Sequence, residues 1–217
     1  MARTRATSRW RLLGALPLAS GAALVVHVLT TISLGLALLG TAVIVALSCV
    51  VAWRRLPPIA RVEVARRARA GLVAGLAATV AYDGSRWIAV NVLHDTFWPF
   101  DIYPIFGQAI IGMGHGFGVI TAIGVLYHYT NGLCFGVAYA IILGTRGWWT
   151  GVFWALGLET LMLAVYPGWL HPRAFDEFVS ISLLGHLVYG ATLGLAGHGL
   201  LARGTRVAND SAARLRT

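Results

Sequence analysis

The sequence predicts an all-α fold, a polytopic membrane helix bundle with about six transmembrane helices and a short interfacial or re-entrant segment. Three observations lead to this prediction. The 217-residue chain is 58% hydrophobic and 12% charged, with a mean hydropathy of +0.74. Its apolar runs are longer than the core of a soluble protein requires. Its arginines gather at the ends of these runs, as is typical of cytoplasmic loops in membrane proteins.

The first apolar run predicts a helical hairpin. Leu12–Trp53 covers about 42 residues, which is enough for two membrane spans of about 20 residues each. We place a tight turn at Thr30 and Thr31, the most polar interruption of the run. The segment Met1–Val28 resembles a signal peptide, but the apolar sequence continues well beyond it. It is therefore interpreted as a retained first helix.

Three further helices and their orientation follow from the arginines. Arg54–Arg69 is predicted to be a basic cytoplasmic loop, because it holds six arginines and two prolines. Ala70–Val92 is the predicted third helix, Trp148–Tyr166 the fifth and Phe178–Ala202 the sixth. Both termini are then cytoplasmic, with fifteen of the seventeen arginines on that side, in agreement with the positive-inside rule. We expect a multi-pass protein of the inner membrane.

The run Ile105–Leu143 can hold one helix or two, and its length of about 39 residues does not decide between them. With one full helix, at Val119–Leu143, Arg146 and the tail arginines fall on the same side as Arg54–Arg69. With two helices, the tail arginines fall outside, against the positive-inside rule. We therefore expect one helix, preceded by a short interfacial or re-entrant segment at Phe106–Gly118.

The predicted chain has three parts. Residues 1–69 form an N-terminal transmembrane hairpin and basic loop, residues 70–202 a four-helix core, and residues 203–217 a basic cytoplasmic tail. Each core helix carries two glycines four residues apart, a spacing that lets helix backbones approach closely in lipid. These pairs are Gly71 and Gly75, Gly132 and Gly136, Gly147 and Gly151, and Gly190 and Gly194.

Polar and ionisable side chains fall at a similar depth on all four core helices. An ionisable group inside the bilayer costs roughly 2.5–3.5 kcal/mol on insertion scales, so it indicates a functional site. At a rise of about 1.5 Å per residue, these groups lie roughly 9–14 Å below the outer surface. We therefore predict one shared buried site in the outer half of the bilayer. Its residues are Asp83, Arg86, His128, Asn131, Glu159 and His186.

Structural roles are the alternative for each of these residues. Asp83 and Arg86, three residues apart on one helix face, can neutralise each other. Arg86 can instead bind an anionic group through its guanidinium. A lone histidine in a helix bundle is more often a hydrogen-bonded packing residue than a ligand. The apolar neighbours of Glu159 offer no partner, so its partner is expected on another helix, or is a proton.

Three kinds of chemistry suit this set of residues. His128, Glu159 and His186 can ligate a metal ion such as zinc, iron or manganese, although the sequence has no short ligand motif. His128 and His186 can serve as the two axial ligands of a haem b. A proton relay through histidine, carboxylate and tyrosine side chains needs no cofactor, because histidine titrates near neutral pH. The sequence leaves these alternatives open.

Four polar residues outside the membrane helices are candidates for the entrance to the site. One lies in the glycine-rich segment before the fourth helix, where it can cap the site. The other three lie in or beside the outer loop before the sixth helix. Ordinary roles for loop residues are the alternative. The four residues are His115, His171, Asp176 and Glu177.

One part of the sequence resembles a known family. The run from Ala70 to Asp83, AGLVAGLAATVAYD, is similar to the opening of small uncharacterised inner-membrane proteins of the YagU type. Two later segments, each a histidine followed by spaced glycines and beginning at His128 and His186, resemble later helices of that family. The resemblance covers residues of about 70–200. It implies the topology and singles out Asp83, His128 and His186, but it implies no reaction.

Three functions are consistent with the sequence. The first is binding or movement of a proton, an ion or a small polar solute in the buried site. The second is a metal-dependent membrane enzyme that acts on a lipid-like substrate. The third is a non-catalytic subunit of a larger membrane complex. The expected partners are membrane lipids and, for transport, a second copy of the chain in a homodimer.

Two classes of function are excluded or not expected. The seventeen basic residues are all arginine, and the absence of lysine excludes a lysine Schiff base, including that of a retinal pigment. The net charge of +9 does not indicate a nucleic-acid partner, because arginines at helix ends suit loops over anionic lipid.

Overall fold

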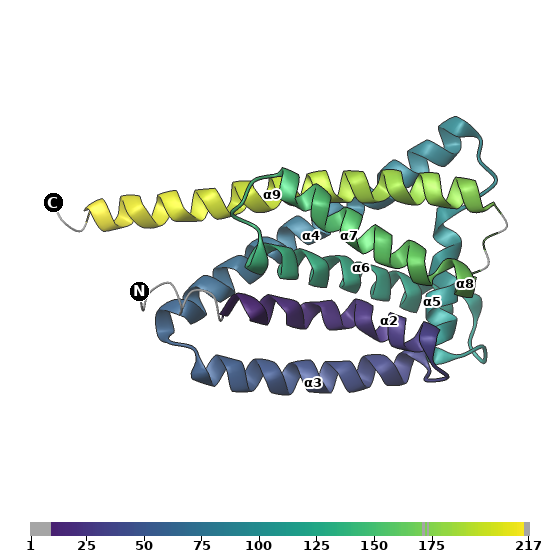
Figure 1. The fold of residues 1–217 in the computed structure, drawn as a ribbon, viewed down its shortest axis with the longest axis horizontal. Helices are drawn as coiled ribbons and strands as arrows, with labels where there is room; N and C mark the ends of the chain where they lie inside the picture. Colours follow the sequence, from purple (N-terminus) through teal and green to yellow (C-terminus); the bar gives the residue numbers. More distant parts are fainter. Residues whose placement is uncertain (1–9, 171, 173, 215–217) are drawn as a thin grey trace.

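The chain folds into helices, and the described residues contain no strand. The structure is a computed structural model that describes residues 10–170, 172 and 174–214. Most of the long helices run roughly along one axis of the molecule (Figure 1). The all-α prediction is confirmed. In chain order the helices are η1 (Trp10–Leu18), α2 (Ala19–Leu29), α3 (Leu34–Arg55), α4 (Pro58–Leu93), η2 (Pro99–Asp101), α5 (Ile102–Ile111), α6 (Phe117–Ile142), α7 (Trp149–Val165), α8 (Pro167–Leu170) and α9 (Phe175–Arg214).

Four helical stretches of the described chain are long and apolar enough to cross a membrane. The other two predicted spans correspond to α4 and α7. Helix α7 has only 17 residues, and α4 is less apolar because it carries Asp83 and Arg86. The structure therefore shows four candidate spans, and the total of six stays a prediction. The four stretches are Arg11–Leu29, Leu34–Arg55, Phe117–Ile142 and Phe175–Gly204.

The first hairpin turns where the sequence predicts it. Helix α2 ends at Leu29 and α3 begins at Leu34, so the break includes Thr30 and Thr31. The side chain of Ser33 caps α3, because its hydroxyl accepts a hydrogen bond from the backbone N–H of Leu36 at 3.3 Å. The prediction of a turn at Thr30 and Thr31 is confirmed.

The segment Arg54–Arg69, predicted as a loop, is mostly helical. Pro58 stands in the first turn of α4, where proline is favoured because its missing N–H would have no helical partner. Glu63 then pairs with Arg66 at 2.9 Å and with Arg67 at 2.7 Å. Partial burial raises the pKa of Glu63, but the hydrogen bonds from Arg66 and Arg67 lower it more. The pKa of Glu63 is therefore below its ordinary value. The prediction of a long loop overlooked these helix-stabilising pairs.

The run Ile105–Leu143 contains one long helix, α6, as expected. The segment predicted to be interfacial or re-entrant, Phe106–Gly118, is helical as far as Ile111, where the short helix α5 ends. The two helices form a tight hairpin, since a Cβ atom at Gly107 would collide with the backbone of Ile120. The connection contains Gly112 with a φ of +81°, a conformation that suits glycine.

Close contacts between glycines hold the core helices together. Helix α4 packs on α6 and α9, and α7 packs on α9. A Cβ atom at Gly136 would lie 2.6 Å from the Cα atom of Gly75, and one at Gly151 would lie 2.8 Å from the Cα atom of Gly194. The predicted glycine contacts therefore exist. Gly147 is the exception, because it lies in the turn before α7 with a φ of +113°.

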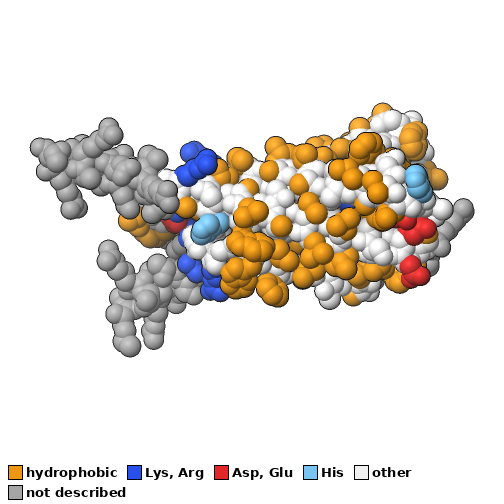
Figure 2. Space-filling view, turned by 90° about the horizontal axis from the view of Figure 1, so that it is seen from above, with side chains coloured by type: hydrophobic (Ala, Val, Ile, Leu, Met, Phe, Trp, Pro, Cys, Tyr) orange, Lys and Arg blue, Asp and Glu red, His pale blue; other side chains and the backbone are white. Residues whose placement is uncertain are grey.

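Charges separate to opposite ends of the bundle. Arginine side chains gather near the end that holds the α3–α4 turn, and acidic side chains gather at the other end (Figure 2). Asp95 and Asp101 lie in the connection between α4 and α5, and Asp176 and Glu177 lie in the first turn of α9. This polarity agrees with the predicted topology, in which the arginine-rich end is cytoplasmic.

Candidate functional site

A cavity of about 1050 Å³ lies between helices α6 and α7, close to the acidic end of the bundle. These two helices follow each other in sequence but make few contacts, and α2 lines the cavity with Gly21, Ala22 and Val25. Most of the wall is apolar. The cavity is large enough for a small organic molecule, since ligand pockets commonly measure roughly 300–1,000 Å³.

The first of two clusters of polar side chains at the cavity is built around Asp83 of α4. Its Oδ1 atom lies 3.2 Å from Nε2 of His128 on α6, although the two atoms do not have the geometry of a hydrogen bond. Its Oδ2 atom accepts a hydrogen bond from the hydroxyl of Tyr103 at 2.9 Å. Arg86 is more distant, with 3.8 Å between Nη1 and Oδ1. The expected pairing of Asp83 with Arg86 is therefore the longest of the three contacts.

The second cluster of polar side chains is built around Glu159 of α7. Glu159 is 2% exposed. Its Oε2 atom lies 2.7 Å from Nδ1 of His186 and accepts a hydrogen bond from the hydroxyl of Ser182 at 3.1 Å. Both partners belong to α9, so the prediction that Glu159 has its partner on another helix is confirmed. Nδ1 of His186 also lies 3.0 Å from the carbonyl oxygen of Ser182. The ring nitrogen left for a ligand is Nε2.

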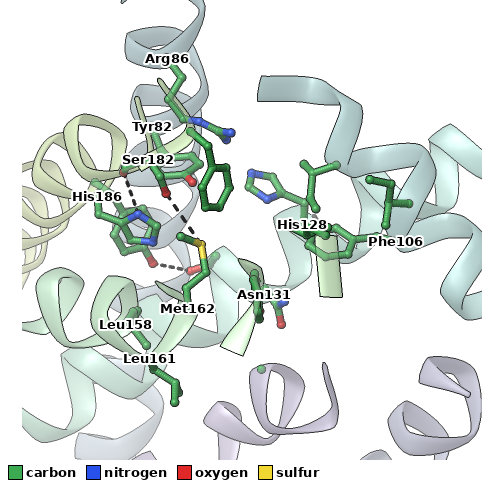
Figure 3. Close-up of a pocket in the computed structure, with 18 of the residues that line it drawn as sticks. Tyr82, Arg86, Phe106, His128, Asn131, Leu158, Leu161, Met162, Ser182 and His186 are labelled. Atoms are coloured by element: carbon green, nitrogen blue, oxygen red, sulfur yellow. Dashed lines mark hydrogen bonds between the residues drawn. The ribbon is translucent and has the colours of Figure 1, made fainter. Parts of the chain in front are cut away.

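Tyr82 lies between the two clusters. Its ring centroid is 5.8 Å from that of His128 and 5.1 Å from that of His186. The guanidinium of Arg86 lies over the same ring at 4.6 Å and donates a hydrogen bond to the carbonyl oxygen of Pro99 at 3.0 Å. Figure 3 shows His186 and His128 on opposite sides of the pocket, with Arg86 above them.

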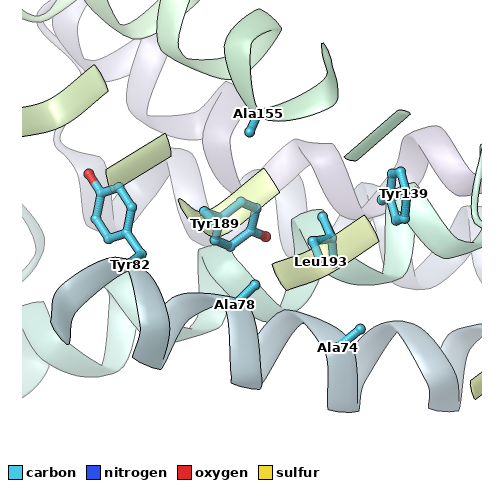
Figure 4. Close-up of a cluster of buried hydrophobic side chains, with 7 residues drawn as sticks. All are labelled: Ala74, Ala78, Tyr82, Tyr139, Ala155, Tyr189 and Leu193. Atoms are coloured by element: carbon cyan, nitrogen blue, oxygen red, sulfur yellow. The ribbon is translucent and has the colours of Figure 1, made fainter. Parts of the chain in front are cut away.

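Beside Tyr82, the site rests on a rigid core. Tyr82 stands at one end of a row of buried side chains that continues through Tyr189 and Leu193 toward Tyr139 (Figure 4). The hydroxyl of Tyr189 donates a hydrogen bond to the carbonyl oxygen of Gly132 at 2.9 Å, which ties α9 to α6 below the site. The packing therefore fixes the helices that carry both histidines.

The side chains that face the cavity differ in charge from those behind them. Arg86, His128 and His186 line the cavity, whereas Asp83 and Glu159 contact the histidines from behind. A carboxylate in that position orients an imidazole and stabilises its protonated form. The charged side chains that a ligand meets are therefore basic, apart from the exposed Asp101.

Several buried polar atoms of the site have no hydrogen-bond partner among the described residues. A buried polar atom normally has one, so those on the residues that line the cavity, Arg86, His128 and Asn131, mark places where a ligand can bind. Asn131, the sixth predicted site residue, lines the cavity from α6. The unpartnered atoms are Oδ1 of Asp83, Nε of Arg86, Nε2 of His128, Oδ1 of Asn131 and Oε1 of Glu159.

The two histidine–carboxylate pairs come from two pairs of helices, α4 with α6 and α7 with α9, that have the same residue spacing. In the first helix of each pair, a carboxylate stands twelve and eight residues after two glycines. In the second, a histidine stands four and eight residues before two glycines. The chain therefore contains the same motif twice, and each copy supplies one pair. The residues are Gly71, Gly75, Asp83, His128, Gly132 and Gly136 in one copy, and Gly147, Gly151, Glu159, His186, Gly190 and Gly194 in the other.

The predicted metal ligands are not brought together. Among the residues that the structure describes, no three histidine, cysteine or carboxylate side chains lie close enough to hold a metal ion. His128 belongs to one pair, whereas His186 and Glu159 form the other. The residues present therefore do not fit a metal bound by His128, Glu159 and His186 together.

The predicted entrance residues differ in where they lie relative to the cavity. Glu177 accepts hydrogen bonds from the backbone N–H groups of Thr96 and Phe97 at 2.8 and 2.7 Å, and these two residues line the cavity. Asp176 beside it is exposed, and His115 is exposed in the α5–α6 connection and is not part of the cavity wall. His171 lies outside the described residues.

Sequence reasoning missed three residues that complete the site. Tyr82, Tyr103 and Ser182 hold or separate the predicted groups, and none was among the six candidates. Two of them had a sequence signal. Tyr82 precedes Asp83 directly, and Ser182 stands one helical turn before His186. Tyr103 had no such signal, because only the α5–α6 hairpin brings it to α4.

Comparison with known proteins gives no relative for this chain. No family model, no curated protein and no solved structure matches it. The resemblance to YagU-like proteins therefore stays a prediction.

Proposed function

We propose that this chain is a multi-pass inner-membrane protein with six spans and both termini in the cytoplasm. The separation of arginines and carboxylates to opposite ends of the bundle supports this orientation. Helices α4 and α7 would be the third and fifth spans. Their lower hydropathy or length is tolerated because each turns its polar residues toward protein rather than lipid.

The orientation is tested by labelling single cysteines in spheroplasts, with the native Cys49 and Cys134 replaced by serine. We expect Asp95→Cys to react with a membrane-impermeant maleimide in intact spheroplasts. Arg69→Cys should react only after the membrane is permeabilised, because the proposed topology places the arginine-rich segment Arg54–Arg69 on the cytoplasmic side. The reverse labelling pattern would contradict the proposed topology.

We further propose that the site binds one amphiphilic molecule and exchanges a proton with its surroundings. The observation that carries this proposal is the cavity of about 1050 Å³, which joins apolar walls to a polar group of two histidine–carboxylate pairs. A proton or a small ion alone does not need such a volume. The apolar part of a ligand would lie along α2, α6 and α7, and its polar head would lie between His128 and His186.

The other two functions have weaker support. A metal-dependent enzyme needs ligands that converge, and His128, Glu159 and His186 fall into separate pairs. A purely structural subunit does not need a buried polar atom without a partner on a cavity wall, such as Nε of Arg86.

Filling the cavity tests whether a ligand occupies it. Ala22 lines the cavity from α2, and the variant Ala22→Trp would place an indole in the space. We expect wild-type protein purified in mild detergent to retain about one amphiphile per chain, measured by mass spectrometry of extracted lipid. In Ala22→Trp the amount should fall about tenfold, which corresponds to about 1.4 kcal/mol.

The matched control for this variant is Val43→Trp. Val43 lies on α3 with its side chain 51% exposed, outside the cavity wall. This variant should retain as much bound amphiphile as the wild type. Equal amounts in folded wild-type and Ala22→Trp protein would show that the retained lipid sits elsewhere.

A further inference from the structure

We propose that the head of the bound amphiphile is a monoanion, and that it binds together with one proton. This inference rests on the proposed function and names the ligand class. It follows from the order of charges around the cavity. Arg86, His128 and His186 face the space, and the two carboxylates lie behind the histidines. A negatively charged head is the chemistry that such a wall recognises.

The donors that face the cavity are not all in use. Nε of Arg86 is buried and has no hydrogen-bond partner among the described residues, although Nη2 bonds to Pro99. His186 uses Nδ1 for Glu159 and leaves Nε2 for a ligand. An oxyanion placed between these groups would accept hydrogen bonds that the protein itself does not satisfy.

The balance of charge explains why a proton accompanies the anion. With both imidazoles neutral, Asp83 and Glu159 outnumber Arg86 by one negative charge. One protonated histidine makes the empty site neutral, which is favoured because net charge is costly to bury. A monoanion restores a negative charge, and protonation of the second histidine makes the occupied site neutral. Binding therefore takes up about one proton.

The other groups around the histidines do not change this balance near neutral pH. Tyrosine and serine hydroxyls remain neutral there, so they donate or accept hydrogen bonds without changing charge. Asp101 also lines the cavity, but it is exposed, and water screens its charge. The remaining neighbours are Tyr82 from α4, Tyr103 from α5, Tyr129 from α6, and Ser182 and Tyr189 from α9.

Three amphiphilic probes that share a dodecyl chain but differ in head group test the proposal. Dodecanesulfonate is an anion at every pH used, dodecanol is neutral and dodecylamine is a cation. Binding to the protein in phosphatidylcholine nanodiscs is measured by competition with a fluorescent fatty amphiphile. At pH 6 the sulfonate should bind at least about tenfold more tightly than dodecanol, a difference of about 1.4 kcal/mol. Dodecylamine should bind most weakly.

The pH dependence tests the coupled proton. Because the sulfonate head does not titrate, any change with pH belongs to the protein. Its affinity should fall by up to about tenfold per pH unit as the pH rises, because binding takes up about one proton. Dodecanol should show little change. A flat sulfonate profile, or a profile that rises with pH, would overturn the coupling.

Variants identify the side chains that cause the preference for an anion and the pH dependence of binding. Arg86→Gln should remove most of the preference for the sulfonate while dodecanol still binds, which also shows that the variant is folded. His186→Gln should flatten the pH profile. Arg69→Gln, which changes an exposed arginine of α4 outside the cavity wall, should behave like the wild type. Unchanged selectivity in a folded Arg86→Gln protein would overturn the assignment of the anion to this site.

The results also separate this inference from the proposed function. If all three probes bind equally and Ala22→Trp blocks each of them, the cavity binds amphiphiles and the anionic head is wrong. If dodecylamine binds best, the same conclusion holds. If Ala22→Trp leaves the binding of every probe unchanged, the proposed function itself is wrong.

Discussion

Gly151→Leu should destabilise the protein by about 3 kcal/mol, the upper end of the usual cost of overpacking a tight interface. Gly151 is where α7 crosses α9, and it is buried. A Cβ atom at this position would lie 2.7 Å from the backbone nitrogen of Gly194 and 2.8 Å from its Cα atom. Backbone atoms cannot move aside as side-chain tips do, so the two helices would have to separate. The contact of Glu159 with His186 would separate with them.

Helix α7 contains its own control for this change. Gly157 lies on the same helix, and a Cβ atom there would have no heavy atom within 4 Å. Gly157→Leu should therefore change the free energy of unfolding by less than about 1 kcal/mol, since leucine also favours the helix over glycine. Unfolding in mixed detergent, followed by helicity, measures both variants. Similar stabilities for the two proteins would show that α7 and α9 do not pack through Gly151.

The helices of this fold could be predicted because apolar length and glycine spacing are local properties. The turn at Thr30 and Thr31 and the contacts of the glycine pairs follow from such local patterns. The short helix α5 and the helical start of α4 do not. They depend on Gly107 and Gly124 fitting the opposite backbone, and on Glu63 pairing with arginines one turn away. Hydropathy carries neither piece of information.

The sequence predicts how deep in the membrane the site lies, but not which carboxylate pairs with which histidine. The rise per residue places Asp83, His128, Glu159 and His186 at one level, but it says nothing about which helices are neighbours. The structure pairs Asp83 with His128 more closely than with Arg86, because α4 and α6 cross at their glycines. The repeated spacing of glycine, carboxylate and histidine would have indicated both pairs. That signal spans two pairs of helices and is lost when each helix is considered alone.

His186→Leu alone should destabilise the protein by about 3–5 kcal/mol, the usual cost of removing one partner from a buried ion pair. Glu159 would keep Ser182 as a hydrogen-bond donor, but its charge would have no imidazole at 2.7 Å. Thermal unfolding in detergent, beside the wild type, measures the loss.

The double variant Glu159→Leu/His186→Leu should recover most of this loss, to within about 1 kcal/mol of the wild type, because a buried pair replaced by apolar side chains is often neutral or stabilising. It should nevertheless lose the bound amphiphile and the pH-dependent binding of dodecanesulfonate. Stability and binding would then respond in opposite ways to the same change. That result would mean that the pair is retained for its chemistry, since an apolar contact holds α7 to α9 equally well. If the double variant is as unstable as His186→Leu, the pair instead has a structural role.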